Sequence, residues 1–194
     1  MNSNPINPFE YVSILISIIL GLGITQILSA FTDLLYHFKK IKFYWPHTLW
    51  ILFVLFLHIQ DWFVSYQLKG KQAWYLPELF FVLLYPISLF AIAKMLLPTN
   101  ESEERYDMKK FYFSQYRMIF LIVSVAIVVS MLFNLILLKD TFLQQLPFLI
   151  FLIAMVWGSI KKIENEWIHK SIAFIIFCVS IISVFIDQES WVIK

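Results

Sequence analysis

The chain has 194 residues, of which 60% are hydrophobic and only 14% are charged, and its net charge is +2. Soluble domains carry about 45–50% apolar and about 25% charged residues. A soluble fold of this composition would therefore expose a large apolar surface. The small net charge also gives no reason to expect a nucleic-acid partner. We expect an integral membrane protein whose main partner is the lipid bilayer.

Six long apolar stretches account for most of the chain. A bilayer core about 30 Å thick is crossed by about 20 apolar residues in a helix, and only helices and closed barrels satisfy their backbone groups in lipid. The stretches lack the alternating polarity of barrel strands. We predict an all-α fold, an integral membrane six-helix bundle, forming a single domain over 1–194. The predicted spans are 9–32, 44–66, 75–97, 116–138, 142–160 and 167–186.

The basic residues alternate from loop to loop and predict an orientation. Eleven of the fifteen fall in or beside the loops after spans one, three and five, and the other four are Lys69, Lys71, Lys139 and Lys194. Loops rich in Lys and Arg face the cytoplasm. Both termini are then expected to face outward. The stretch before Lys39 has no basic residue, so it does not fit a signal peptide, and span one is expected to stay in the membrane.

The loop after span three is the only sizeable one. Thr99 or Asn100 can cap a helix, acidic residues follow, and Lys109 and Lys110 come at the other end. This order suits the helix dipole. We expect a short cytoplasmic helix that continues into span four.

Span one carries a stripe of small residues spaced by four, and small residues let helix backbones approach closely in lipid. We interpret this stripe as a packing face within the molecule, with contact in a homo-oligomer as the alternative. Its members are Ser13, Ser17, Gly21, Thr25 and Ser29.

Span two carries a second stripe, at spacings of three and four, which places its members on one helix face. They are His47, Trp50, Val54, His58, Asp61 and Ser65, and Gln60 lies beside them. Ionisable groups inside a membrane are costly and usually face the bundle interior or water. His58 and Asp61 are therefore the candidate core of a ligand-binding site, and a structural hydrogen-bonded pair is the alternative.

The predicted orientation brings further polar residues to the outer third of the bundle. Glu10 is the supporting member of the site, because it begins span one on its packing face. The others are Glu78, Asn134, Gln144, Gln145 and Asp187. Together with His58 and Asp61 they would line an outward-facing polar cup, and the simpler interpretation is that helix ends are polar because they touch headgroups and water.

Motifs for cofactors and catalysis are weak or lacking. Three of the four histidines fall near the predicted cytoplasmic helix ends, which leaves His58 without a facing imidazole for haem ligation. Lys170 fits retinal chemistry poorly because it lies near a helix end. Zinc motifs, a Walker loop and a serine nucleophile elbow do not occur. We therefore assign no cofactor, no metal and no catalytic residue.

The first half of the chain resembles a known group of proteins. The resemblance lies in Glu10–Ser13, Leu20–Gln26, Tyr44–His47 with Trp50, Gln60–Trp62 and Tyr85–Pro86. This pattern is similar to that of small multi-pass bacterial inner-membrane proteins of unassigned function. The resemblance implies a bacterial inner-membrane setting and transfers no activity.

These observations favour a non-enzymatic membrane protein that binds or passes a small ligand or cation through the polar cup. The first alternative is a structural or scaffold subunit that contacts membrane partners through its helices. The second is a membrane-embedded enzyme acting on lipid, in which His58 and Asp61 would form an acid–base pair.

The orientation can be tested by cysteine labelling in a Cys178→Ser background. A cysteine at Gln72 is expected to react with an impermeant thiol reagent on intact cells. A cysteine at Ser102 is expected to react only after lysis, because eleven basic residues hold its side of the protein in the cytoplasm. The opposite labelling pattern would reverse the predicted orientation.

Overall fold

The computed structural model describes residues 7–36, 38–98 and 106–186. The described residues form an all-α fold with six helices that are long and apolar enough to cross a membrane. The main helices are α1 (Pro8–Tyr36), α2 (Trp45–Ser65), α3 (Leu76–Met95), α4 (Met108–Phe133), α5 (Leu146–Ile160) and α6 (Glu166–Ile186). Short 3-10 turns follow α2 and precede α5, at Tyr66–Gly70 and Phe142–Gln145, and a π-helical turn, Asn134–Leu138, extends α4.

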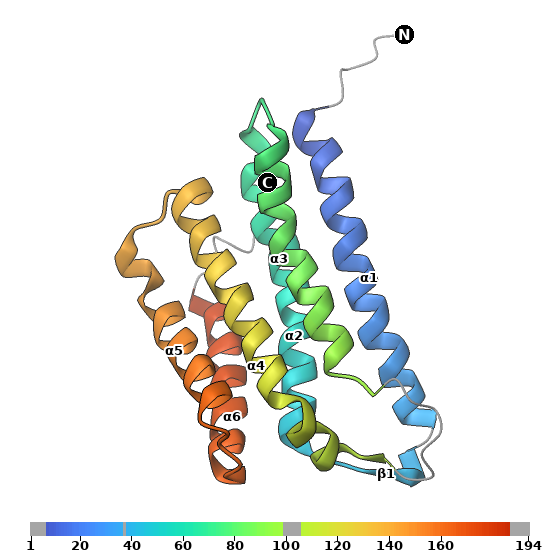
Figure 1. Ribbon diagram of the computed structural model, residues 1–194. Helices are drawn as coiled ribbons and strands as arrows, with labels where there is room; N and C mark the ends of the chain where they lie inside the picture. The colour runs from blue at the N-terminus through green and yellow to red at the C-terminus, as the bar shows by residue number, and fades with distance from the viewer. Residues whose placement is uncertain (1–6, 37, 99–105, 187–194) are drawn as a thin grey trace.

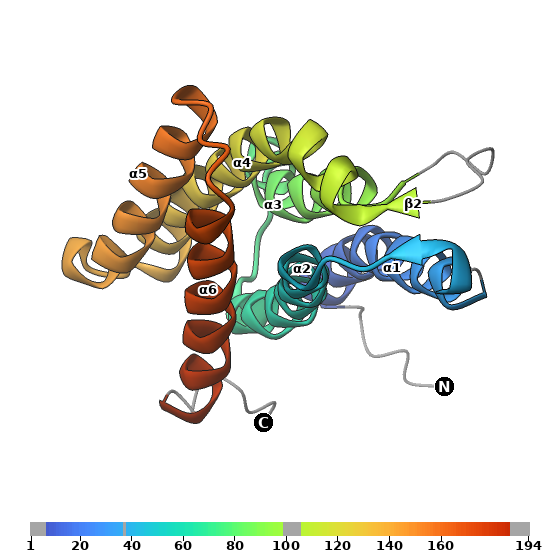
Figure 2. The same ribbon diagram turned by 90° about the horizontal axis from the view of Figure 1, so that it is seen from below.

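The six helices lie in two layers (Figures 1 and 2). One layer contains α3, α4 and α5, and the other contains α1, α2 and α6. Contacts between the layers are closest where α1 and α2 pack on α3. At the other edge, α5 packs on α4 and α6 packs on α2, but α5 and α6 are not a closely packed pair. The bundle is therefore closed at its α1–α3 edge and splayed at its α5–α6 edge.

The predicted spans are confirmed as helices, and we describe two differences in their bounds, at the end of α1 and at the start of α4. Helix α1 continues to Tyr36 rather than stopping at residue 32. Helix α4 begins at Met108, eight residues before the predicted span, because Asp107 caps it by accepting a hydrogen bond from the Lys110 amide (3.0 Å). Lys109 and Lys110, predicted to end a short helix that continues into span four, lie in the first turn of α4. That helix does not extend back across Tyr106–Asp107, which form a short strand, and its predicted start lies outside the described residues.

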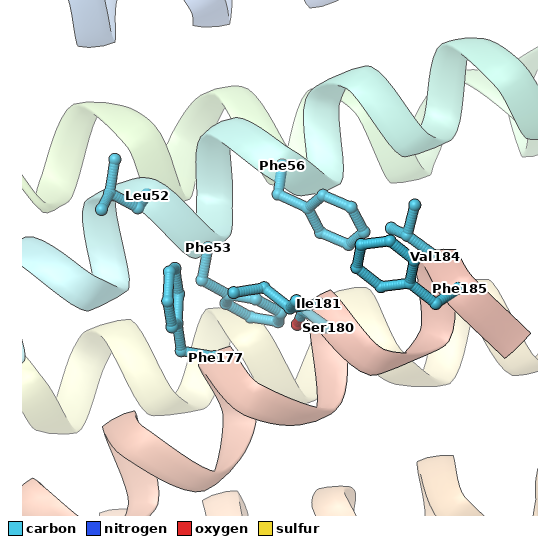
Figure 3. A pocket seen from close by; sticks show the side chains of 8 residues that line it. All are labelled: Leu52, Phe53, Phe56, Phe177, Ser180, Ile181, Val184 and Phe185. Carbon is cyan, nitrogen blue, oxygen red and sulfur yellow. The ribbon is translucent and has the colours of Figure 1, made fainter.

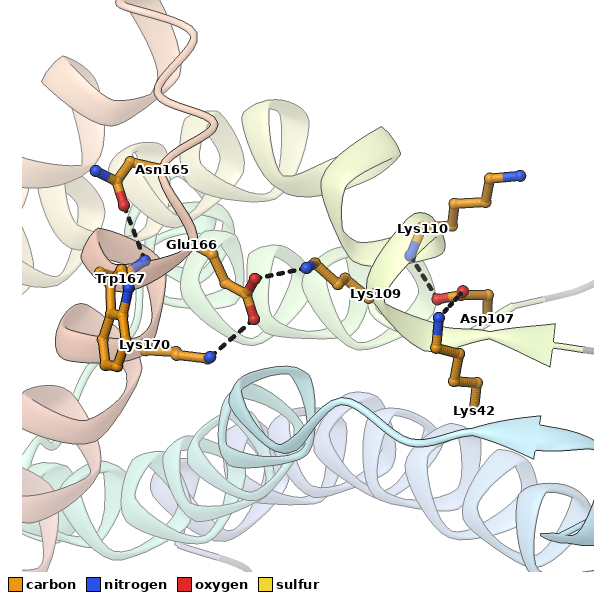
Figure 4. A network of polar contacts seen from close by, with 8 residues as sticks. All are labelled: Lys42, Asp107, Lys109, Lys110, Asn165, Glu166, Trp167 and Lys170. Atoms are coloured by element: carbon orange, nitrogen blue, oxygen red, sulfur yellow. Dashed lines mark hydrogen bonds and ion pairs between the residues drawn. The ribbon is translucent and has the colours of Figure 1, made fainter.

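The loops after α1, α3 and α5 gather at one end of the bundle, which we call the basic end. There the two-residue strands β1 (Ile41–Lys42) and β2 (Tyr106–Asp107) pair in parallel. Lys42 pairs with Asp107 (3.2 Å), and Glu166 at the start of α6 bridges Lys109 of α4 and Lys170 of its own helix (Figure 4). The hydrogen bond from the Lys110 amide and the contact with Lys42 hold the pKa of Asp107 below its usual value.

A buried cluster of aromatic and histidine side chains lies directly inside the basic end. His47 Nε2 donates to the Leu96 carbonyl (2.6 Å), which ties α2 to the end of α3. His169 Nε2 donates to the Ile163 carbonyl (2.6 Å), so its Nδ1 is the acceptor of the Tyr112 hydroxyl (2.9 Å). These bonds give His47 and His169 structural roles, and they fix the start of α6 against α4.

Two tyrosines one turn apart on α4 provide a test of this cluster. Tyr112→Phe is expected to lower the free energy of unfolding by about 1–3 kcal/mol, because it leaves the buried Nδ1 of His169 without a partner. Tyr116→Phe is the matched control, because the Tyr116 hydroxyl is buried with no hydrogen-bond partner among the described residues. Loss of the Tyr116 hydroxyl should leave the free energy of unfolding unchanged or raise it. Unfolding in detergent, followed by circular dichroism, measures both; equal losses would contradict the assigned hydrogen bond.

Candidate functional site

The splayed edge of the bundle contains a large hollow. It has a volume of about 710 Å³ and is lined by α2, α4, α5 and α6, with two side chains of α3. We call it the α5–α6 cleft. Ligand sites are typically mostly apolar hollows of about 300–1,000 Å³ with a few placed polar groups. The cleft fits that description in both size and composition.

The cleft exists because α5 packs along α4, whereas α6 contacts α4 at its start and packs along α2. Gly158 of α5 lies so close to Phe120 of α4 that an added Cβ would meet its ring at 3.0 Å. Beside this contact, Arg117 Nε donates to the Ser159 carbonyl (2.8 Å), and Ser159 Oγ donates to the Arg117 carbonyl (3.0 Å). Helix α6 is instead held by α2 and by its Tyr112 and Glu166 contacts at the basic end. Figure 2 shows the two helices diverging from that end.

A second, smaller hollow of about 260 Å³ lies along the α2–α6 contact (Figure 3). Phe53, Phe56 and Ser180 line both hollows, so they form the partition between them. On the α6 side, Phe177 and Phe185 face α2 across the small hollow. The wall between α2 and α6 is therefore built largely from phenylalanine rings, which pack by shape without hydrogen bonds.

The polar groups of the cleft lie in its half away from the basic end. Gln60 of α2, Ser130 of α4 and Ser183 of α6 are near the ends of their helices. Tyr85 of α3 lies between these residues and the apolar half of the cleft. The half toward the basic end is closed by Ile92, Met155 and Ile172 and is entirely apolar. The cleft is therefore amphipathic along its length, with one polar and one apolar end.

Asp61 stands next to this polar end. It follows Gln60, and it lies one helical turn beyond Leu57, which lines the cleft. The Asp61 carboxylate and the Tyr85 phenol are close enough to interact electrostatically. The Asp61 Oδ2 atom is buried and has no hydrogen-bond partner among the described residues. Of the predicted site residues, Gln60 lines the cleft, and Asp61 lies beside it without lining the cleft.

His58 is fully buried and faces α1 rather than the cleft. Its Nδ1 donates to the Val54 carbonyl one turn back (2.7 Å), so the neutral ring presents a bare Nε2. Gly23 of α1 lies against that ring, and an added Cβ would stand 2.6 Å from His58 Cδ2 and closer still to Nε2. His58 packs against α1, and no hydrogen bond between His58 and Asp61 is found among the described residues, so the structure does not show the predicted pair as one site.

Glu10 is also separate from His58, which corrects the predicted cup. The ring of its neighbour Phe9 packs edge-on against the ring of Tyr66, just beyond the end of α2, with 6.2 Å between the ring centroids. Gly23 is the residue of α1 that meets His58, and it lies about 20 Å along the helix from Glu10 at 1.5 Å per residue. Glu10 is exposed, so it belongs to the rim of the bundle.

The other cup residues are used in local caps and turns. Glu78 pairs with Lys71 (3.2 Å), Gln144 caps Thr141, and Gln145 joins Asn134 and Asp140. Asp187 lies outside the described residues. These bonds hold the α2–α3 and α4–α5 connections, and they do not form a shared cup with His58.

The predicted packing stripe of α1 is displaced from the face that packs within the molecule. Ser13, Ser17 and Gly21 are half-buried, Thr25 and Ser29 are exposed, and an added Cβ at Gly21 would meet nothing within 4 Å. The buried face consists instead of Phe9, Val12, Ile16, Leu20, Gly23, Ile27 and Ala30. The stripe is therefore wrong as the main intramolecular face. The reason is that large apolar residues fill most of the interface, and small size is needed only where His58 approaches.

Sequence analysis missed Tyr85 and the serines of the cleft. Ser180 and Ser183 donate to carbonyls of their own helix, as serines in apolar helices commonly do, so their sequence positions alone do not mark a site. Among the described residues, no group of three or more His, Cys, Asp or Glu side chains is placed to hold a metal ion.

Comparison with protein-family models, curated proteins and solved structures finds no match for this chain. The resemblance of the first half to small bacterial membrane proteins therefore stays a prediction.

Two glycines on α1 provide a matched test of the His58 interface. Gly23→Ala is expected to cost about 1–3 kcal/mol of stability, because the methyl group would overlap the imidazole and force the helices apart. Gly21→Ala should be neutral or slightly stabilising, because its Cβ enters open space and alanine favours helix by up to about 1 kcal/mol.

A double variant separates overlap with His58 from other effects. In a His58→Ala background the Gly23→Ala substitution should lose most of its cost, since the ring it strikes is gone. Thermal unfolding in detergent measures all four proteins. An undiminished cost in the double variant would show that Gly23 does not act through His58.

Proposed function

We propose that this chain is a multi-pass protein of the bacterial inner membrane with both termini facing outward. Six described helices are long and apolar enough to span a bilayer, and large apolar side chains are exposed along every one of them. The connections after α1, α3 and α5 meet at the basic end, which supports a common side for them. The bacterial setting rests on the resemblance of the first half of the chain.

Within the membrane, we propose that the protein binds a small amphipathic ligand in the α5–α6 cleft. The observation that carries this proposal is a hollow of about 710 Å³ with an apolar floor and a polar opposite end. Along α6 it extends from Ile172 to Ser183, about 16 Å at 1.5 Å per residue. This is close to half of a hydrocarbon core about 30 Å thick. A hydrocarbon chain from one leaflet therefore fits its length.

The cleft favours ligand binding over the alternatives. An ion path needs polar groups along its length, and the half of the cleft toward the basic end has none. An acid–base role for His58 fits poorly, because its Nδ1 is bonded to Val54 and its Nε2 faces Gly23.

Filling the cleft is expected to remove ligand binding. Ala154 is half-buried on the cleft wall of α5, and Ala154→Phe would place a ring in the hollow. The adjacent Ile153 is exposed on the other face, so Ile153→Phe is the matched control. Tritiated dodecanol is the probe, with protein in phosphatidylcholine nanodiscs and empty nanodiscs as the background.

We expect saturable dodecanol binding to the unmodified protein and to Ile153→Phe, and a loss of about tenfold or more in Ala154→Phe, a loss of about 1.4 kcal/mol in binding free energy. Binding that is equal in all three proteins, or indistinguishable from empty nanodiscs, would remove the cleft as a ligand site.

A further inference from the structure

We infer that the α5–α6 cleft selects a lipophilic cation, a hydrocarbon chain with a positively charged ammonium group, and that Asp61 binds the charge. This inference rests on the proposed function, because it names the ligand class of the same cleft. It depends on the position and surroundings of the Asp61 carboxylate, which the apolar cleft alone does not explain.

Asp61 lies one helical turn beyond cleft-lining side chains of α2 and does not itself line the cleft. Phe53 and Leu57 line the cleft at successive turns of α2, and Asp61 occupies the next turn. Gln60, which lines the polar end, is its direct neighbour, and Tyr85 of α3, which also lines the cleft, is close enough to interact with the Asp61 charge. A chain lying against Phe53 and Leu57 would therefore carry its head group to the level of Asp61.

Among the described residues, the Asp61 carboxylate has no partner. Its Oδ2 is buried without a hydrogen bond, and none of the four ion pairs among the described residues includes Asp61. Lys71 on the same side of the bundle is bound to Glu78. A buried ionised carboxylate is very unfavourable unless it is paired. A bound cation would supply the missing charge, whereas an anionic head group would be repelled.

The wall of the cleft beside its polar end is aromatic. Phe56, Tyr85, Phe148 and Phe151 all line the cleft. Aromatic faces attract cations, and quaternary ammonium groups are commonly bound by such surfaces. Shape, hydrophobicity and charge therefore point to the same class of ligand.

The test compares two probes with the same chain, dodecyltrimethylammonium and dodecanol, bound to the protein in phosphatidylcholine nanodiscs. The unmodified protein should prefer the cation by about tenfold. Asp61→Asn should reduce this preference to near one while dodecanol binding is retained, which also shows that the variant is folded. Asp61→Glu should keep a preference for the cation. Glu10→Gln is the control, because Glu10 is an exposed carboxylate away from the cleft.

A second measurement needs no variant. Dicyclohexylcarbodiimide modifies carboxyl groups in apolar surroundings, and mass spectrometry locates the product. Dodecyltrimethylammonium should protect Asp61 from modification, and dodecanol should protect it less.

The outcomes separate this inference from the proposed function. If Ala154→Phe weakens dodecanol binding but Asp61→Asn leaves the preference for the cation unchanged, the cleft stands and the inference is overturned. Equal affinity of the two probes for the unmodified protein, or equal protection of Asp61 by both, would overturn it as well. If Ala154→Phe reduces the binding of neither probe, the proposed function itself is overturned.

Discussion

The separate anchoring of α5 and α6 determines the form of this molecule. The two helices follow each other in sequence, and a short connection would ordinarily make them packing neighbours. Here the close approach of Gly158 to Phe120 commits α5 to α4, while Tyr112 and Lys109 hold the start of α6 in place and α2 supports the rest. Each helix therefore uses its best packing face elsewhere, and the space between them stays open.

The polar side chains of α2 are divided by helix geometry between two sites. Gln60 and His58 are two residues apart, about 200° around the helix, so they face nearly opposite directions. His58 meets α1 at Gly23, and Gln60 meets the cleft. Asp61 lies between these directions and next to Tyr85. One face of this helix thus stabilises the closed edge of the bundle, and the nearly opposite face contributes Gln60 to the polar end of the cleft.

The sequence predicted the helices well because their signal is local. An apolar stretch of about 20 residues identifies a candidate span whatever it packs against. The burial of His47, Trp50, Val54 and His58 also followed from spacing alone. The position of Glu10 relative to His58 could not be predicted from spacing, because it depends on where α1 lies against α2. The contact of Phe9 with Tyr66 sets that register, and neither residue shows it in sequence.

The same reason explains the shift from Gly21 to Gly23. Both are small residues in α1, and only the position of the His58 ring distinguishes them. A stripe of small residues predicts that close approach is permitted, whereas the partner helix decides where it occurs. The cleft is still harder to predict from the sequence, because it lies between two helices that do not pack together. No pattern within α5 or α6 predicts that.

An apolar cleft has a different meaning in a bilayer from its meaning in water. Lipid tails are as apolar as leucine, so burial in such a cleft gives little hydrophobic gain over the surrounding membrane. Discrimination among ligands must then come from shape and from the few polar groups at the end of the cleft. In this protein those groups include the Gln60 amide and the Tyr85 phenol, and the unpaired carboxylate of Asp61 lies beside them. Of these three, only the carboxylate would distinguish a cation from a neutral molecule of the same length, so we propose that the selectivity of the cleft depends on Asp61.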